Sequence, residues 1–146
     1  MKRKRIRLTS PDAKYGHWWF EIGDRRDPSS ESYGWWPQNL GTWVRLVWGT
    51  LSGVPGELNG QTLYPTGRAD RDPHHDDEDD IDDVFHPKVA ALDRRTDQEI
   101  HDCLRRFART YTGKWQWTCG YGKNCRTFQT AAMKHCGLRR GPSARP

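Results

Sequence analysis

The expected start of a helix at Cys125 constrains the fold of this chain more strongly than any other feature of its sequence. Asn124 is a good N-cap, and Gly122 lets the preceding loop turn sharply. The apolar residues that follow recur at helical spacing, and Gly137 is a natural stop. These apolar residues are Phe128, Ala131, Ala132 and Cys136. The pattern predicts a helix with Cys125 in its first turn, where the positive end of the helix dipole acts.

A strand is predicted over residues 15–22, where apolar and more polar positions alternate. Its apolar face consists of Trp18, Phe20 and Ile22. His17 lies on the other, less apolar face. A histidine at this place suits a cleft, and it equally suits a solvated strand surface.

Cys125 and His17 together are candidates for a nucleophile and its base. The thiolate is the nucleophilic form of cysteine, and a free cysteine with a pKa near ~8.5 is only slightly ionised at neutral pH. A helix N-terminus and a nearby imidazolium both stabilise the thiolate. The alternative is that Cys125 is a small buried residue at a helix start.

Two segments resemble the motifs of a known group. Gly16-His17 opens an aromatic-rich strand, and residues 124–128 read Asn-Cys-Arg-Thr-Phe. They resemble the early strand histidine and the late Asn-Cys-x-x-Phe helix start of circularly permuted papain-like hydrolases, which are relatives of the NlpC/P60 superfamily. The resemblance covers the two ends of the chain and leaves the middle unmatched. Thr127 stands where many members have histidine, so no particular subfamily is implied.

The resemblance implies a permuted papain-like α+β fold and acyl chemistry at Cys125. Members of the group are amidases, isopeptidases, deamidases and lipid acyltransferases, and they include small bacterial effectors and cell-wall amidases. A third polar group should orient the histidine. In the permuted arrangement, this group is expected on the strand that follows the histidine strand.

Glu31 is the predicted third residue, because it begins the next strand candidate, over residues 31–36. A carboxylate accepts the imidazole N–H and stabilises the imidazolium. A register slip of one residue would select Ser32 or Tyr33 instead. Glu21, on the histidine's own strand, is another candidate. The predicted catalytic residues are therefore Cys125, His17 and Glu31.

We expect one domain over residues 1–146, in which a small antiparallel sheet packs on two or three helices. Residues 1–10 and 139–146 are expected to be flexible tails. Residues 70–83 hold nine acidic residues and one arginine, which predicts a solvated acidic loop. The alternatives are a docking segment for a basic partner and a segment that folds back against the protein's own arginines. This segment lacks the EF-hand pattern of a calcium site.

Other parts of the chain give clear local signals. Thr96 and Glu99 form a capping box at the start of an apolar helical stripe that ends at Tyr111. A strand is expected over residues 40–50 and a turn-rich loop over residues 54–60. The eight tryptophans are expected in the core of the sheet, although some could line a groove for a sugar or a peptide.

The four cysteines do not make a disulfide-dense scaffold at this length. Cys103 lies in the apolar stripe and is expected in the core, whereas Cys119 is near enough to pair with Cys136 or Cys125. The spacing of Cys119 and Cys125 is not that of a zinc knuckle, and no histidine follows at finger spacing. No metal and no cofactor are therefore predicted.

Charge and hydropathy limit the partners. The formal net charge is +5, but the positive residues lie mostly at the two ends and no nucleic-acid motif is present. Nucleic acid is therefore not expected as a partner. No apolar run approaches the length of a membrane span. The basic residues 1–7 lack the apolar segment of a signal peptide. We expect a cytoplasmic protein, or one exported by a signal-peptide-independent secretion system.

The sequence therefore predicts a cysteine-dependent hydrolase of amide bonds, of the amidase or peptidase kind found among toxins, effectors and cell-wall hydrolases. Its expected partner is a peptide, protein or peptidoglycan substrate, and the sequence leaves an inhibitor or immunity protein open. One alternative is a non-enzymatic module that binds glycan or nucleic acid through its aromatic and basic surface. The other is an acyltransferase that uses the same pair of residues.

Overall fold

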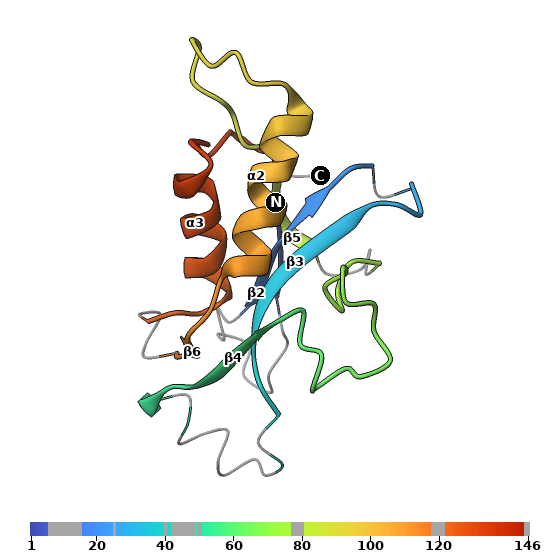
Figure 1. Ribbon diagram of the computed structural model, residues 1–146, viewed down its shortest axis with the longest axis vertical. Coiled ribbons are helices and arrows are strands. Elements are labelled where there is room, and N and C mark those ends of the chain that lie inside the picture. Colours follow the sequence, from blue (N-terminus) through green and yellow to red (C-terminus); the bar gives the residue numbers. More distant parts are fainter. Residues whose placement is uncertain are drawn as a thin grey trace.

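The computed structural model describes residues 1–5, 16–24, 26–39, 41, 49, 51–76, 81–117 and 122–144 (Figure 1). The strands are β1 (Lys2–Arg5), β2 (Gly16–Ile22), β3 (Glu31–Pro37), β4 (Val54–Leu58), β5 (Ile81–Phe85), β6 (Lys114–Trp115) and β7 (Ser143–Ala144). The long helices are α2 (Asp97–Thr110) and α3 (Cys125–His135). The fold is α+β with a small antiparallel sheet, which confirms that part of the predicted fold class.

The described strands form one sheet in the order β6-β4-β3-β2-β1-β5-β7, and each neighbouring pair is antiparallel. The pairing of β2 with β3 runs from Ile22 opposite Glu31 to Trp19 opposite Gly34. From Trp35 onward, β3 pairs with β4 instead. The first residues of β2, which include His17, therefore extend past the pairing with β3.

Helices α2 and α3 lie side by side against one face of the sheet (Figure 1). Phe20 and Ile22 of β2 and Trp35 of β3 point into this layer, as the alternation in β2 predicts. Phe128 of α3 is fully buried among them and stacks on Phe20, with ring centroids 5.6 Å apart. Burial of these apolar faces supplies the main driving force for folding.

Both helices begin where the capping residues predict. Thr96 and Glu99 form the expected capping box of α2. The side chain of Asn124 accepts hydrogen bonds from the backbone N–H groups of Arg126 and Thr127, so α3 begins at Cys125. These caps satisfy backbone donors that a helix start leaves without intrahelical partners.

The face of the sheet away from the helices is covered by the segment between β4 and β5 (Figure 1). This corrects the expectation of an acidic loop in solvent over residues 70–83. Asp72 and His75 are each 1% exposed. Residues 81–85 form β5, and residues 77–80 lie outside the described part. The segment is buried because its polar groups find partners on β3, as described below.

Four further expectations need correction or lie outside the described residues. Lys2–Arg5, expected in a flexible tail, forms β1 in the middle of the sheet, because its backbone pairs with β2 on one edge and β5 on the other. Ser143–Ala144, expected in the other tail, pairs with β5. Val54–Leu58, expected in a loop, forms β4. Apart from Gly41 and Gly49, the strand expected over residues 40–50 lies outside the described residues.

A disulfide joins Cys103 of α2 to Cys136 at the end of α3. Cys103 packs against the core as expected, and its bond leaves Cys136 no sulfur for Cys119. Cys119 itself lies outside the described residues. Among the described cysteines, Cys125 has a free thiol. Within the described part of the chain, no helix has the length and apolar character needed to cross a membrane.

Reduction of the disulfide between Cys103 and Cys136 is expected to lower the free energy of unfolding by about 2–4 kcal/mol, because the bond restricts the unfolded chain. Urea unfolding with and without reductant, followed by circular dichroism, measures the effect. The Cys125→Ser variant is the control, and it should lose the same stability on reduction. Coincident unfolding curves for the oxidised and fully reduced protein would contradict the prediction.

Candidate active site

The fold brings Cys125 and His17 together, although 107 residues separate them in the sequence. The two side chains lie close enough to interact, and Cys125 is among the groups that raise the pKa of His17. The Cys125 thiol also makes a long contact, of 3.9 Å, from Sγ to the carbonyl oxygen of Gly16. Cys125 is partly exposed, whereas His17 is only 4% exposed.

Asp72 holds the other side of the imidazole. The His17 Nε2 and Asp72 Oδ2 atoms are 2.8 Å apart, and both side chains are buried. Because Nε2 faces Asp72, Nδ1 is the ring nitrogen left for the thiol. Trp36 donates a second hydrogen bond, of 2.8 Å, from Nε1 to the same oxygen, and the backbone N–H of His74 donates to Oδ1.

The charges of His17 and Asp72 stabilise each other. Burial alone would lower the pKa of His17, but the Asp72 carboxylate outweighs it and raises that pKa to about 10. Burial would likewise raise the pKa of Asp72, but His17 and the hydrogen bond from Trp36 hold it below its ordinary value. The pair is therefore an imidazolium and a carboxylate at neutral pH.

Gly34 lies in close contact with both members of this pair, and its lack of a side chain leaves room for them. A Cβ atom at Gly34 would overlap Asp72 Oδ2 and would lie 2.6 Å from His17 Nε2. Any side chain here would push the carboxylate and the imidazole apart. The strands β2 and β3 stop pairing at Gly34, so the glycine lies where the sheet opens to admit the two side chains.

Ser32 and Asn59 fix the segment that carries Asp72. The backbone N–H of Asp72 donates to Ser32 Oγ at 2.8 Å, and the backbone N–H of Ser32 donates to the carbonyl of Asp70 at 3.0 Å. Asn59 donates from Nδ2 to the carbonyl of Ser32 at 3.1 Å and accepts from the backbone N–H of Gly34 at 3.0 Å. Both residues are buried, and both connect the segment directly to β3.

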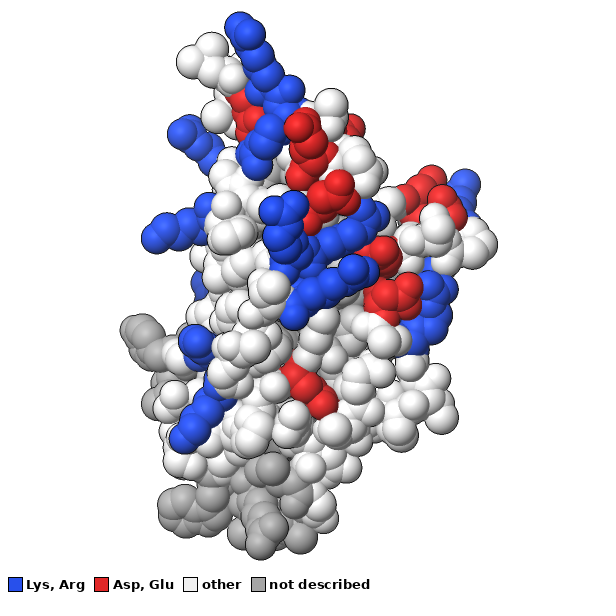
Figure 2. Space-filling model, viewed as in Figure 1, with Lys and Arg blue, Asp and Glu red and all other residues white. Residues whose placement is uncertain are grey.

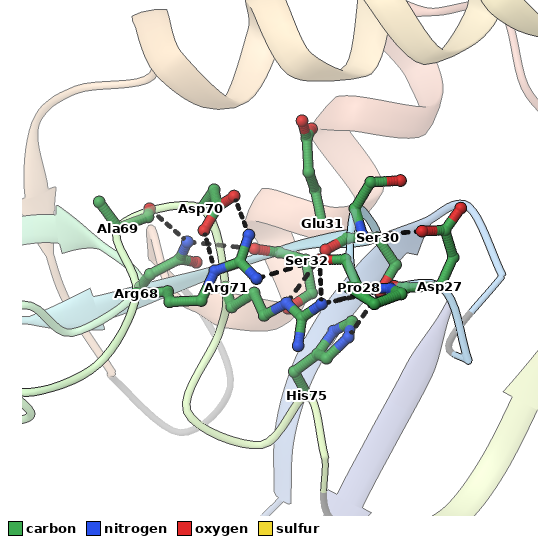
Figure 3. A network of polar contacts seen from close by, with 12 residues as sticks. Asp27, Pro28, Ser30, Glu31, Ser32, Arg68, Ala69, Asp70, Arg71 and His75 are labelled. Atoms are coloured by element: carbon green, nitrogen blue, oxygen red, sulfur yellow. Dashed lines mark hydrogen bonds and ion pairs between the residues drawn. The ribbon is translucent and has the colours of Figure 1, made fainter.

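Arg71 connects the same segment to the turn before β3 (Figure 3). Its guanidinium donates to the carbonyl of Ser30 at 3.0 Å and to that of Pro28 at 2.8 Å. Arg68 also donates to Pro28, at 3.1 Å, and forms an ion pair with Asp70. The turn and the segment thus hold each other through several hydrogen bonds, immediately next to Asp72.

His75 is a second buried histidine on this segment. Its Nε2 lies 3.0 Å from Ser30 Oγ, and its Nδ1 lies 3.9 Å from Glu21 Oε1 without a hydrogen-bond partner. Burial lowers the pKa of His75. Ser30 and His75 are too deeply buried to meet a substrate, since they are 2% and 1% exposed. This contact therefore anchors the segment and does not form a second reactive pair.

Gln129 fixes α3 against β2, one turn after Cys125. Its side chain is 2% exposed and donates from Nε2 to the carbonyl of Trp19 at 2.8 Å. The hydrogen bond satisfies a strand carbonyl close to where β2 and β3 part. Sequence reasoning did not single out Gln129, although a polar residue on the apolar side of a helix is a signal for such a contact.

Glu31, the predicted third residue, lies elsewhere. It pairs with Ile22, five residues along β2 from His17. Its carboxylate accepts hydrogen bonds from Tyr33 at 2.8 Å and from Arg105 of α2 at 2.7 Å. The antiparallel register places Glu31 at the far end of the β2–β3 pair, and Asp72 is the carboxylate that contacts His17.

The alternatives to Glu31 as the third catalytic residue also have partners other than His17. Glu21 accepts a hydrogen bond from Trp19 and forms an ion pair with Lys2. Ser32 binds the backbone of Asp72, as described above. Sequence reasoning missed Asp72 because it lies in an acid-rich run. The turn-forming Pro73 and two histidines that follow it were the available signal that this part of the run is not simply solvated.

The described residues form no metal centre, and the surface near α2 is not of a single sign. Among the described residues, no group of three or more His, Cys, Asp or Glu side chains is arranged to hold a metal ion. Figure 2 shows Lys and Arg side chains interspersed with Asp and Glu over the described surface near α2. Arg105, for example, pairs with both Glu31 and Asp102.

Comparisons of this chain with protein-family models, curated proteins and solved structures find no match.

Replacing Gly34 with alanine is expected to separate His17 from Asp72 and to lower the free energy of unfolding by roughly 1–3 kcal/mol, through overpacking. The same change should slow alkylation of Cys125 by iodoacetamide. Gly67→Ala is the matched control, because Gly67 is exposed and a Cβ there would lie 3.2 Å from its nearest atom. If Gly34→Ala and Gly67→Ala behave alike, the crowding argument fails.

The stability that His17 gains from Asp72 should depend on pH in a defined direction. The folded-state pKa of His17, about 10, lies above its unfolded value of 6.5. The contribution is therefore complete below about pH 6.5 and is lost as the pH rises through about 10. Urea unfolding of the wild type and Asp72→Asn should show a stability difference that is large at pH 6 and smaller at pH 10.

A direct measurement is the proton NMR titration of the His17 ring. The resonance should remain that of an imidazolium at pH 8 in the wild type. In Asp72→Asn, the pKa should fall to 6.5 or below, because burial then acts without the carboxylate. A wild-type titration midpoint near 6.5 would rule out the stabilised imidazolium.

Proposed function

We propose that this protein is a cysteine-dependent hydrolase of amide bonds, with Cys125 as nucleophile, His17 as general acid and base, and Asp72 as the residue that orients His17. The observation that carries the proposal is that one imidazole interacts both with the side chain of Cys125 and with a buried carboxylate. This is the relation that nucleophile, base and orienting group have in hydrolases of the triad kind.

Each group has a defined role in the proposed reaction. The imidazolium of His17 stabilises the Cys125 thiolate, whose sulfur attacks the carbonyl carbon of the amide. His17 then gives its proton to the leaving amine, and a water molecule, deprotonated by the imidazole, hydrolyses the thioester. Asp72 holds the His17 ring through Nε2, both when the ring is an imidazolium and when it is a neutral imidazole.

The first turn of α3 contributes the electrophilic part of the site. The side chain of Asn124 accepts from the N–H groups of Arg126 and Thr127. The N–H of Cys125 has no intrahelical acceptor, because it is the first residue of the helix. We assign this N–H to the stabilisation of the oxyanion that forms when the sulfur attacks.

The proposal includes a permuted papain-like arrangement. The histidine comes first, on a strand, and the cysteine comes later, at a helix start. In the described structure both lie in one α+β unit with an antiparallel sheet. The substrate class of the proposal is a peptide, a protein or a peptidoglycan stem peptide.

The disulfide between Cys103 and Cys136 favours an oxidising compartment as the place of action. Of the two localisations expected from the sequence, we therefore propose the exported one. This location fits a peptide or cell-wall substrate outside the cytoplasm.

Alkylation of Cys125 by iodoacetamide near pH 7, followed by peptide mass spectrometry, tests the proposed site without a known substrate. His17→Ala and Asp72→Asn should each slow the alkylation at least about tenfold, since a positioned base is worth more than that in catalysis. Glu31→Gln is the matched control, because it removes a carboxylate that binds Arg105 and should leave the rate unchanged.

Two further sets of measurements complete this experiment. Circular dichroism and urea unfolding establish that each variant is folded. Mass spectrometry of peptidoglycan fragments and peptides, incubated with the wild type or Cys125→Ser, then separates hydrolysis from acyl transfer by the mass of the product. Equal and slow alkylation of Cys125 in the wild type and in His17→Ala would refute the proposed function.

A further inference from the structure

Arg126 occupies an electrostatically unfavourable place for a cation. It is the second residue of α3, where the helix dipole is positive and acidic residues are favoured. The first turn of α2 follows this rule, with Asp97 and Glu99. The first turn of α3 has no acidic residue and carries Arg126 instead.

No described carboxylate neutralises the guanidinium of Arg126. Some other described arginines do form ion pairs with carboxylates, among them Arg68, Arg95, Arg105 and Arg140. Arg126 is exposed, and its guanidinium lies over the ring of Trp18, 5.9 Å from the centroid. A cation placed this way is retained by an aromatic ring and keeps its charge available to a ligand.

The contact is made by the residues that follow the two reactive side chains in the sequence. Arg126 follows Cys125 in the chain, and Trp18 follows His17. The next residue after each reactive side chain thus takes part in one contact between α3 and β2. A substrate whose carbonyl reaches Cys125 is therefore bound one residue along α3 from a positive charge that no described carboxylate neutralises.

Building on the proposed function, we infer that Arg126 determines specificity for acyl donors that carry a carboxylate close to the scissile carbonyl, as an acidic peptide does. Arg126 binds the carboxylate, and the positive end of α3 adds to the attraction. Trp18 is the platform that holds the guanidinium in place.

Iodoacetate and iodoacetamide test this inference as a matched pair of probes. Both alkylate Cys125 by the same step, in which the thiolate sulfur bonds to the methylene carbon and iodide leaves. They differ in that iodoacetate carries a carboxylate. The measured quantity is the ratio of the two second-order rate constants, iodoacetate to iodoacetamide, which cancels changes in the reactivity of the thiol itself.

Arg126→Gln should lower this ratio roughly threefold or more at low ionic strength, and Arg126→Lys should restore part of it. Lys134→Gln is the matched control, since it removes one exposed positive charge from the same helix, about 12–13 Å farther along its axis. Its ratio should equal that of the wild type. High salt should reduce the difference between wild type and Arg126→Gln.

The outcomes separate the two proposals. An unchanged ratio in Arg126→Gln, with His17→Ala still slowing both reactions, overturns the role of Arg126 and leaves the proposed function standing. An equal fall of the ratio in Lys134→Gln also overturns it, because the effect is then one of net charge. If His17→Ala changes neither rate, the proposed function fails and the inference fails with it.

Discussion

The contact between His17 and Asp72 is the interaction on which the rest of this structure depends. Removing a cation and an anion from water is costly, and their attraction offsets the cost only if the remaining polar atoms are also satisfied. Trp36 and the backbone of His74 supply the further hydrogen bonds to Asp72. Two features follow from this requirement. One is the covering segment, which is the segment between β4 and β5 that carries Asp72, and the other is the opening of the sheet at Gly34.

The covering segment is ordered by polar contacts more than by apolar burial. Asn59, Ser32 and Arg71 connect it to β3 and to the preceding turn through backbone groups. Such contacts fix position more sharply than apolar packing does, because each hydrogen bond has a narrow range of distance and angle. A carboxylate that must meet one ring nitrogen needs this kind of support.

Much of the fold could be predicted from local sequence signals. The rest could not, because it depends on polar contacts between residues far apart in the sequence. The caps at Thr96 and Asn124 and the alternation in β2 depend on neighbouring residues, so the sequence reveals them. Asp72 contacts His17, which is 55 positions away in the sequence. The acid-rich composition of its segment predicted a solvated loop instead. Glu31 begins the next strand, but an antiparallel register places the start of one strand opposite the end of the other. Choosing the carboxylate therefore required the register, which no local pattern supplies.

The pairing of His17 with Asp72 also explains why the start of α3 matters to the proposed reaction. The buried pair has no net charge, so at a distance it attracts an anion only weakly. Beyond the direct interaction of His17 with Cys125, the positive charge that favours a thiolate or a substrate carboxylate comes from nearby groups outside the pair. The N-terminus of α3 provides part of it through its backbone dipoles. Arg126 provides the rest, and the absence of acidic residues from this turn preserves both contributions.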